Sequence, residues 1–532
     1  MVVRHHAGGV LLAISAPVDQ LFLATEVNEW ALCASLAELD PTKESLLEQA
    51  LRQAAPEAKP PPVIEENAAL ARFQQLQSTQ ENPALLSLLD AARARSLPNA
   101  FDDTHLTLGA GAGARSFLLA TLPRPEAVPW VELFSIPTAL VTGSNGKTTT
   151  VRLLAACARA HGWHTGYNCT DGVFLDDQTV ASGDYSGPAG ARLVMRGDRT
   201  QAAILETARG GILRRGLAVS CADTAVVTNI SSDHFGEYGI DDLEGLADVK
   251  LSVVGALDAS GLLVLNADDE VLRRRVQTLP QRFGSVPRFG WFALDDEQVL
   301  LREHRAHGGW TCGVRAQRLL LSCGSEPHDL GSISDMPLSI GGLANYNVAN
   351  LAAAALAARE LGIPASTIAQ VFARFGAEAR DNAGRMMHFD AAGVRVLIDY
   401  AHNPEGLRGF LSVAQGLRGG HGRLGLILGH AGNRKDADIQ ALARVAAEFH
   451  PDLIVVKENE TQLRGRTPGE IPGILRAELL RLGVPGSALP MSASEYEAAR
   501  FALDWARPGD VLALPLHGSG ARDAVVALLE SP

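Results

Sequence analysis

The fold of this chain is decided by residues 142–150, which read TGSNGKTTT. The apolar run PTALVT precedes this stretch at 137–142, and a segment with helical spacing follows it at 148–161. This order predicts a strand, a glycine turn and a helix. Gly143 and Gly146 would let backbone N–H groups approach an anion without a Cβ in the way, and a helix N-terminus favours negative charge. The stretch therefore predicts a phosphate-binding loop.

Lys147 and Thr148 supply the side-chain chemistry of such a loop. A lysine ammonium is a mobile point charge for phosphate, and a threonine hydroxyl can join a Mg²⁺ shell. The common pattern G-x-x-x-x-G-K-[ST] is not met, because Val141 occupies its first glycine position. The plain alternative is a glycine turn capped by threonine, with a solvated lysine. The order of strand, glycines, lysine and threonine favours the phosphate loop.

Length and composition narrow the function classes. The chain has 532 residues, 46% of them hydrophobic, and a formal net charge of −13, which disfavours general nucleic-acid binding. No apolar run approaches the roughly 20 residues of a membrane helix, and the short apolar stretch at 10–14 does not suit a secretion signal. The six cysteines contain no CxxC pair, which argues against a zinc ribbon or a disulfide framework. We expect a cytoplasmic protein without nucleic-acid or membrane partners.

From residue 136 onward, short apolar runs alternate with helical segments. This alternation predicts α/β domains built on doubly wound parallel sheets, whose strands are covered on both faces. A turn-rich segment at 295–335 is interpreted as a small β insertion. The expected strands lie at 137–142, 202–205, 224–229, 261–266, 394–398, 424–428, 453–457 and 510–514.

A proline-rich run at 122–129 and a break in the pattern near Gly384 indicate two domain boundaries. We expect a small α/β N-terminal domain at 1–130, a central P-loop domain at 131–383 and a second, Rossmann-like α/β domain at 384–532. The first domain carries no catalytic signature. It either docks an acceptor substrate or covers an apolar sheet edge.

Acidic and imidazole side chains follow the next strands. Glu206 comes directly after the strand at 202–205, and Asp233 and His234 come just after the strand at 224–229. Ligands of open α/β sheets bind at the carboxyl ends of the strands, so Glu206 and His234 are candidate metal ligands. A lone glutamate there is more often a helix cap or a solvated group, and a lone histidine is more often structural. Their shared sheet edge with the phosphate loop favours the metal role.

Further cations follow these strands. Arg209, Arg214 and Arg215 form a basic cluster, which would recognise a carboxylate or phosphate or simply cover a solvated helix start. Lys250 lies in a segment with helical spacing, where a surface lysine is the simpler interpretation.

The whole set of motifs resembles the Mur ligase family, whose members are ATP-dependent ligases that join a carboxylate to an amine. The motifs, in the family's order, are TGSNGKTTT, Glu206, SSDH at 231–234, Asn347-x-x-Asn350, Gly384-Arg385 and DYAHNP at 399–404. Three more stretches look like the Mur-ligase half of cyanophycin synthetases: ETARGGILRRGL at 206–217, GNRKD at 432–436 and LRGRTPGE at 463–470. Only about 135 residues precede the phosphate loop, too few for a complete ATP-grasp module with another domain. The resemblance therefore implies a ligase with a single site.

The resemblance implies a role for each matching residue. The ATP phosphates would be held by Gly143, Ser144, Asn145, Gly146, Lys147, Thr148 and Thr149. Thr148 and Glu206 would share one Mg²⁺, and His234 would hold a second metal ion. Asn347 and Asn350 would read the adenine, whereas Arg385 and Asp399 would contact phosphate and ribose. Lys250 lies where several family members carry a carbamylated lysine, and it joins Lys147, Glu206 and His234 in the expected catalytic set. Substrate would be bound by Thr207, Arg209, His402, Asn433 and Arg434.

The expected function is an ATP-dependent ligase that adds an amino acid to a carboxylate of a peptide or amino-acid polymer through an acyl phosphate. ATP and Mg²⁺ are the expected cofactors. Two other classes stay open: a P-loop kinase or NTPase, and a nucleotide-binding scaffold that has lost the chemistry. The sequence also leaves open a separate ATP-grasp ligase as a partner, assembly into a homo-oligomer, and the identity of acceptor and amine.

Overall fold

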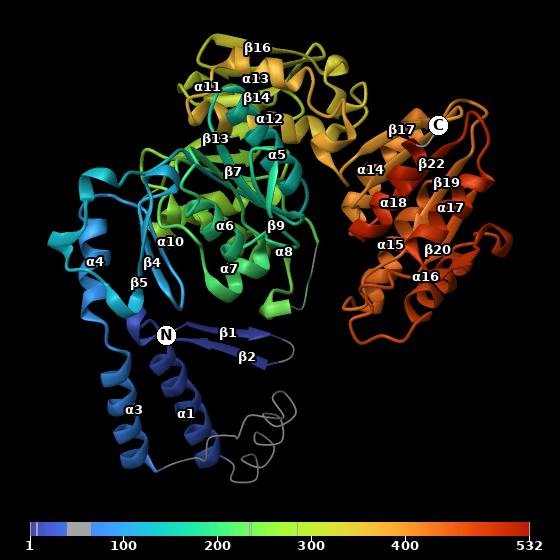
Figure 1. The fold of residues 1–532 in the computed structure, drawn as a ribbon. Helices are drawn as coiled ribbons and strands as arrows, with labels where there is room; N and C mark the ends of the chain where they lie inside the picture. Colours follow the sequence, from blue (N-terminus) through green and yellow to red (C-terminus); the bar gives the residue numbers. More distant parts are fainter. Residues whose placement is uncertain are drawn as a thin grey trace. The chain divides into compact units, whose positions relative to one another are not determined.

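A computed structural model of the protein describes residues 2–6, 9–39, 65–232, 235, 237–284 and 286–530 (Figure 1). The chain forms two compact units. The first contains Met1–Ser135 and Phe235–Asp241, and the second contains Ile136–His234 and Asp242–Pro532. Among the helices of the described residues, none combines the length and the apolar character needed to cross a bilayer.

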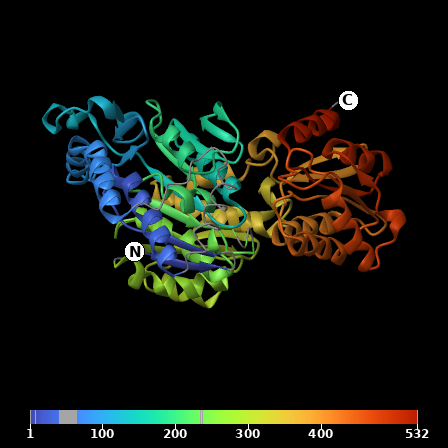
Figure 2. The same ribbon diagram turned by 90° about the horizontal axis from the view of Figure 1, so that it is seen from below.

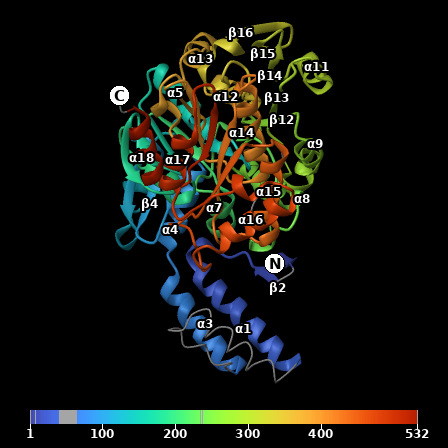
Figure 3. The same cartoon turned by 90° about the vertical axis from the view of Figure 1, so that its right-hand side faces the viewer.

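The described residues of the first unit form two small β-structures and the α-helices α1, α3 and α4. Its helices α1 (Leu21–Leu39) and α3 (Glu66–Gln80) run side by side, as Figures 1 and 3 show. α4 (Pro83–Arg93) begins at a proline, and the Asn82 side chain accepts a hydrogen bond from the backbone N–H of Leu85. Leucines of α4 then pack on a small sheet in a core of its own. The strands are β1 (Val2–His6), β2 (Gly9–Ala13), β3 (Asn99–Phe101), β4 (His105–Leu108) and β5 (Arg115–Leu118).

An 11-stranded sheet organises the first part of the second unit. Its order is β16-β15-β14-β13-β12-β11-β6-β10-β7-β8-β9, and the strands from β14 to β7 pair in parallel. β6 (Thr138–Thr142) is central and fully buried, so the loop that follows it leaves from the middle of the sheet. The other strands are β7 (Thr165–Cys169), β8 (Gly172–Leu175), β9 (Gln178–Ser182), β10 (Ala202–Glu206), β11 (Thr224–Val227), β12 (Leu262–Asn266), β13 (Arg288–Phe292), β14 (Trp310–Arg315), β15 (Arg318–Cys323) and β16 (Glu326–Ser332).

The expected α/β class is confirmed, with one difference at the sheet edge. The segment 295–335, expected as a small insertion, supplies β14, β15 and β16 and so extends the main sheet. Apolar and polar residues alternate along these strands, as is typical of antiparallel strands at a sheet edge. From the sequence alone, this pattern looks like a separate β element.

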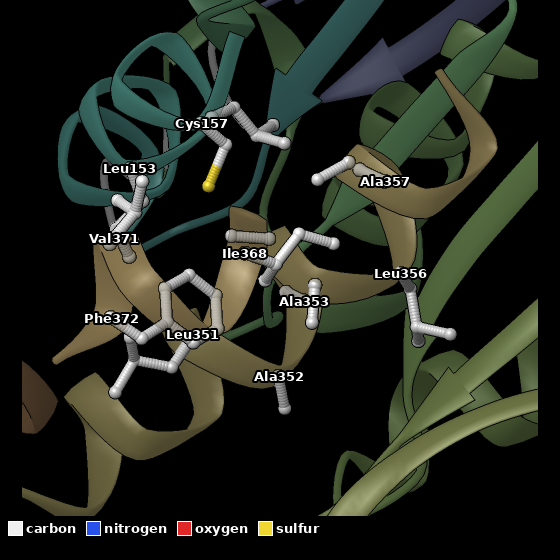
Figure 4. Packing of buried hydrophobic residues seen from close by; sticks show 14 of the residues in the cluster. Leu153, Cys157, Leu351, Ala352, Ala353, Leu356, Ala357, Ile368, Val371 and Phe372 are labelled. Atoms are coloured by element: carbon white, nitrogen blue, oxygen red, sulfur yellow. The ribbon is translucent and has the colours of Figure 1, made fainter. Parts of the chain in front are cut away.

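The main core lies between this sheet and three helices, α5 (Lys147–Ala160), α12 (Asn345–Glu360) and α13 (Ala365–Phe372). Figure 4 shows Leu153 and Cys157 of α5 facing residues of the other two helices, including Phe372. α12 carries four consecutive alanines at 352–355, all buried, so α5 and the sheet can both approach it closely. The remaining helices of this part are α6 (Pro188–Met195), α7 (Arg209–Arg215), α8 (Leu243–Lys250), α9 (Glu270–Arg275), α10 (Leu279–Phe283) and α11 (Val299–Ala306).

A second sheet, of six strands, follows in the orange-to-red part of the chain (Figure 2). Its order is β17-β18-β22-β19-β20-β21, and all pairs except β17 with β18 are parallel. Neighbouring residues belong to different cores: Leu426 packs with α14, α15 and α16, whereas Ile427 packs with α17 and α18. Both faces are therefore covered, as expected for a doubly wound sheet.

The bounds of these elements are as follows. The strands are β17 (Met387–Ala391), β18 (Val394–Asp399), β19 (Leu424–Leu428), β20 (Leu453–Lys457), β21 (Met491–Ser492) and β22 (Val511–Pro515). The helices are α14 (Pro404–Leu417), α15 (Asp436–Glu448), α16 (Glu470–Arg481), α17 (Glu495–Trp505) and α18 (Ser519–Glu530).

Candidate active site

The loop between β6 and α5 requires glycine at both expected positions. Gly143 has a φ of +146°, and a Cβ there would lie 1.8 Å from the Thr228 hydroxyl oxygen. Gly146 has a φ of +84°, and a Cβ there would lie 2.2 Å from the Asn350 amide oxygen. Both backbone conformation and space exclude a larger residue. The loop thus leaves its backbone open at the N-terminus of α5, where an anion is favoured.

Side chains that follow β11 fix the shape of this loop. The backbone N–H of Asn145 donates to the Asn229 side chain at 2.9 Å, and the Ser144 hydroxyl donates to the Ser231 carbonyl at 3.0 Å. The Thr228 hydroxyl donates to the Asn145 carbonyl at 2.5 Å. These hydrogen bonds hold the loop in its conformation.

Two lysines converge on the same loop. Lys147 Nζ donates to the carbonyls of Gly143 and Ser144 at 3.0 and 3.1 Å. Lys250 Nζ donates to the Gly143 carbonyl at 2.8 Å, and the residue is 3% exposed. The interpretation of Lys250 as a surface lysine is wrong, because α8 directs this side chain inward against the phosphate loop.

Glu206 and Thr148 form an oxygen-rich group at the end of β10. The Thr148 hydroxyl donates to Glu206 Oε2 at 2.8 Å, and the Thr170 hydroxyl donates to Oε1 at 3.3 Å. Burial raises the pKa of Glu206, against the opposing attraction of Lys147. A carboxylate with two hydroxyls is a hard-oxygen donor set, and Mg²⁺ typically takes few protein ligands and keeps several waters. The residues present therefore fit Mg²⁺.

The second expected metal ligand, His234, comes from the segment after β11. Asp233 and His234 lie outside the described residues. Within the residues that are described, no group of three or more His, Cys, Asp or Glu side chains converges as a metal site would require. Glu206, with Thr148, is thus the metal candidate that the described residues offer.

The phosphate loop lines a cavity of about 780 Å³ together with residues far away in the sequence. Asn347 and Asn350, on α12, both line it and are linked by a hydrogen bond of 3.2 Å. Arg385 and Asp399 line the same cavity from the second sheet and the segment before it. Burial raises the pKa of Asp399, and the nearby Arg385 opposes that shift. These four residues line one cavity with the loop, and their role in binding a nucleotide stays a prediction.

The DYAHNP segment reaches the loop directly. Asn403 caps α14 by accepting from the Gly406 N–H, and its Nδ2 donates to Asn145 Oδ1 at 2.9 Å. His402 lines the same cavity of about 780 Å³, and the guanidinium of Arg385 lies over the ring of Tyr400, 4.3 Å from its centroid. The helix start after β18 and the phosphate loop therefore form one wall.

The remaining expected substrate residues lie elsewhere. Thr207 and Arg209 are buried after β10, and the Thr207 N–H donates to the Val141 carbonyl. Asn433 and Arg434 lie in the turn after β19, where the Arg434 carbonyl accepts from Arg466 at 2.8 Å. None of these four lines the nucleotide cavity or the second cavity described next.

A larger cavity of about 1400 Å³ adjoins the first. Thr170 and Tyr400 line both, so the two cavities meet beside Glu206. Its walls come from the β7–β9 region, the segment after α13, the loop after β20 and α18. Sequence reasoning missed Thr170, which carries no motif. Tyr400 could have been found, because it lies inside DYAHNP.

Comparison with known proteins agrees with this architecture. The Mur ligase middle domain matches residues 141–358, and the Mur ligase, glutamate ligase domain matches residues 384–515. The cyanophycin synthetase of Synechocystis sp. is 34% identical over 72% of this chain and 43% of that protein. The cyanophycin synthetase of Geminocystis herdmanii is 35% identical over 66% of this chain and 40% of that protein. The chain thus spans less than half the length of these curated relatives.

A solved structure shares the fold. E. coli FolC in complex with DHPP and ADP aligns with a TM-score of 0.53 and 20% identity, over 74% of this chain and 88% of that chain. The two matched domains together take in more than half of the chain, including the phosphate loop, Glu206, the two asparagines of α12 and DYAHNP. This chain belongs to the Mur ligase family.

Proposed function

We propose that this chain is an ATP-dependent ligase that forms an amide from a carboxylate and an amine through an acyl phosphate. The observation that carries the proposal is the junction of the two cavities at Thr170 and Tyr400, next to Glu206. A nucleotide whose phosphates lie on the loop at 143–149 would present its terminal phosphoryl group to a substrate in the larger cavity.

The roles of the residues follow from their positions. Lys147 and the loop N–H groups would hold the phosphates, with Asn347 and Asn350 beside the adenine and with Arg385 and Asp399 beside phosphate and ribose. Mg²⁺, when bound at Thr148 and Glu206, supplies charge neutralisation during phosphoryl transfer. We further propose the division into domains at 1–130, 131–383 and 384–532.

The proposed chemistry has two steps. A carboxylate oxygen attacks the γ-phosphorus of ATP, the bond to the bridging oxygen breaks, and ADP leaves. The amine nitrogen then attacks the acyl carbon, the carbon–oxygen bond to phosphate breaks, and the nitrogen loses a proton as phosphate leaves. Lys147 would stabilise the charge that moves toward ADP, because a fixed ammonium in a dry site needs no reorganisation.

Exclusion of water matters for the intermediate, since water would hydrolyse an acyl phosphate. The contact of Asn403 with Asn145 and the stacking of Arg385 on Tyr400 bring residues of the second sheet against the phosphate loop. Such closure over a reacting group is a common way to keep water out.

The substrate class is proposed from the relatives. Because two cyanophycin synthetases are 34% and 35% identical to this chain over 72% and 66% of its length, we propose an amino acid as the amine and a peptide or amino-acid polymer as the carboxylate. A separate ATP-grasp ligase would then supply any second ligation.

The test is a screen of phosphate release with Mg²⁺, ATP, single amino acids and short peptides of aspartate or glutamate, followed by mass analysis of the product. We expect one pair to give a product heavier by the amino acid less one water. Lys147→Ala should lower this turnover at least a hundredfold, as loss of a charge-stabilising group typically does, with an unchanged circular dichroism spectrum. Wild-type turnover in that variant would remove the phosphate-loop assignment.

The same screen separates the alternatives. A phosphorylated product without an amide would identify a kinase, and phosphate release without any new bond would identify an NTPase. Nucleotide binding without turnover for every pair would identify a scaffold. Each of these outcomes contradicts the proposed ligase.

A further inference from the structure

The larger cavity is unusually rich in arginine, and most of these side chains are already neutralised. Four of them are ion-paired: Arg152 with Asp171 at 2.8 Å, Arg522 with Asp171 at 3.3 Å, Arg159 with Asp177 at 3.5 Å and Arg380 with Glu378 at 2.5 Å. These pairs satisfy one another and need no ligand.

Two arginines of the same cavity differ from these four. Arg374 follows α13, and Arg464 lies in the loop between β20 and α16. Considering every residue that the structure describes, neither guanidinium has an ion pair or a hydrogen bond with another side chain. Arg374 comes from the part of the chain that builds the first sheet, and Arg464 comes from the part that builds the second; the same lining also carries Asp184 and Asp381.

The backbone at Arg464 is held in a conformation that is rare for this residue type. Its φ is +45°, in the left-handed region that non-glycine residues rarely adopt. Strain of this kind collects at functional sites, where the surroundings enforce it.

Arg466 fixes the loop through its own contacts. Its guanidinium donates to the Arg434 carbonyl at 2.8 Å and pairs with Asp436 at 2.7 Å and Glu470 at 2.6 Å. Gly432 lets the loop approach closely, because a Cβ there would lie 1.8 Å from the Leu463 carbonyl oxygen. The motif LRGRTPGE thus contains one arginine that braces the loop and one that is left for a ligand.

The same loop lies on the cavity at which Tyr400 stands. Gln462 and Tyr400 both line the larger cavity, and Tyr400 also lines the smaller one. A ligand bound by Arg464 would therefore lie in the cavity that adjoins the proposed position of phosphoryl transfer. Guanidinium favours carboxylate because its planar donors match two oxygens at once.

We propose that Arg464 and Arg374 bind carboxylates of the acceptor chain, in the larger cavity, and so select a substrate that carries several of them. This inference rests on the proposed function and names the residues that read its acceptor. A cavity of about 1400 Å³ suits a peptide segment rather than one amino acid. Both arginines are binding residues that hold the acceptor while another of its carboxylates reacts.

The experiment measures binding of a fluorescein-labelled peptide of eight aspartates by anisotropy, with Mg²⁺ and a non-hydrolysable ATP analogue. Arg464→Gln and Arg374→Gln should each weaken binding roughly tenfold, as expected for loss of a charge-assisted hydrogen bond, and Arg464→Lys should weaken it less. Arg481→Gln is the matched control, since Arg481 is an exposed arginine of the same part of the chain and pairs with Glu478 outside both cavities. The control should bind as the wild type does. A peptide of eight asparagines should not bind.

Affinity for the ATP analogue should be unchanged in all variants, which shows that they are folded. Wild-type affinity for the aspartate peptide in both glutamine variants would overturn the inference, and so would an equal loss of analogue affinity. A rise in KM for the amino acid, with peptide affinity intact, would also overturn it, because the carboxylate bound would then be that of the amine substrate. If the wild-type protein formed an amide but did not bind the aspartate peptide, this inference would be wrong and the proposed function would stand. If no pair in the substrate screen gave an amide, the proposed function itself would be wrong.

Discussion

Gly146 shows how much of the site depends on single atoms. Gly146→Ala should lower stability by about 1–2 kcal/mol, because its φ of +84° is unfavourable for alanine. It should also raise the KM for ATP at least tenfold, because the new methyl group would displace Asn350, which lines the nucleotide cavity. Steady-state kinetics and thermal unfolding measure the two effects.

Gly162→Ala is the control for this prediction. Gly162 has a φ of +100°, and no atom lies within 4 Å of a Cβ built there. The substitution should cause similar strain and leave the KM for ATP unchanged. If the wild type, Gly146→Ala and Gly162→Ala had equal KM values for ATP, ATP binding would not depend on the present position of Asn350.

Glu206→Gln tests the metal site. The amide has the shape of the carboxylate and lacks its charge, so the Mg²⁺ concentration that gives half-maximal activity should rise at least tenfold. Thr148 can still donate to the amide oxygen, so the fold should persist. EDTA should abolish activity in both proteins, and excess Mg²⁺ should restore part of it in the variant. An unchanged Mg²⁺ titration would remove Glu206 from the metal shell.

At the scale of single residues, local motifs predicted the strand, the glycine turn and the helix within residues 138–160. The sequence predicted that Lys147, Thr148 and Glu206 follow strands of one sheet. In the structure Lys147 contacts its own loop, and Thr148 donates to Glu206. The surface interpretation of Lys250 failed because burial depends on how α8 packs. Thr170 was missed for a similar reason: its contact with Glu206 crosses from one strand to its neighbour.

At the scale of elements, a buried ion pair ties three pieces of the second sheet together. Glu495, at the start of α17, pairs with Lys457 at the end of β20 and accepts from the N–H groups of His517 and Gly518 after β22. Lys457 and Glu495 are both buried. Burial raises the pKa of Glu495, but Lys457 and His517 together lower it by more, so that this pKa lies far below its ordinary value.

Glu495→Gln should therefore destabilise the protein by about 3–5 kcal/mol at neutral pH, because Lys457 would keep a buried charge without its partner. Since the folded pKa of Glu495 is depressed, its contribution is complete above the ordinary value of 4.5 and is lost as the pH falls below that value. The difference in the free energy of unfolding between wild type and variant, measured with urea, should thus be large at pH 7 and smaller at about pH 4. Glu497→Gln, an exposed change on the same helix, should cost less than about 1 kcal/mol. A loss of less than about 1 kcal/mol for Glu495→Gln at pH 7 would contradict a stabilising role for this ion pair.

The helices and strands themselves were largely predictable. The strands expected at 202–205, 424–428 and 453–457 form within one residue of those bounds, because buried parallel strands are continuous apolar runs between turn residues. The segment 295–335 was different. Its antiparallel strands join the main sheet through pairing that depends on partners distant in the sequence.

At the scale of the whole molecule, closure is the main expectation. Asn403 donates to Asn145, and Arg522 pairs with Asp171, so the part after Gly384 contacts the phosphate-loop part of the second unit on both sides of the cavities. A nucleotide bound between these contacts should favour the closed form. We expect the radius of gyration from X-ray scattering to fall when Mg²⁺ and an ATP analogue with substrate are added.

Lys147→Ala should show no such compaction under the same conditions. An unchanged radius of gyration in the wild type would argue against Gly384 as a hinge. The sequence indicated this hinge by a change of pattern, whereas the cavities on either side of Tyr400 could not be foreseen. Cavities arise from the spacing between packed elements, and no local motif records that spacing.

The bracing of one loop by another has a practical consequence for protein engineering. Arg466 reaches the carbonyls of Gly432 and Arg434, and Gly432 is the residue that admits Leu463. A chimaera that borrows residues 458–469 to alter selectivity would fail unless it also imports 429–436. The two segments form a single transplantable cassette, although 20 or more positions separate them along the polypeptide.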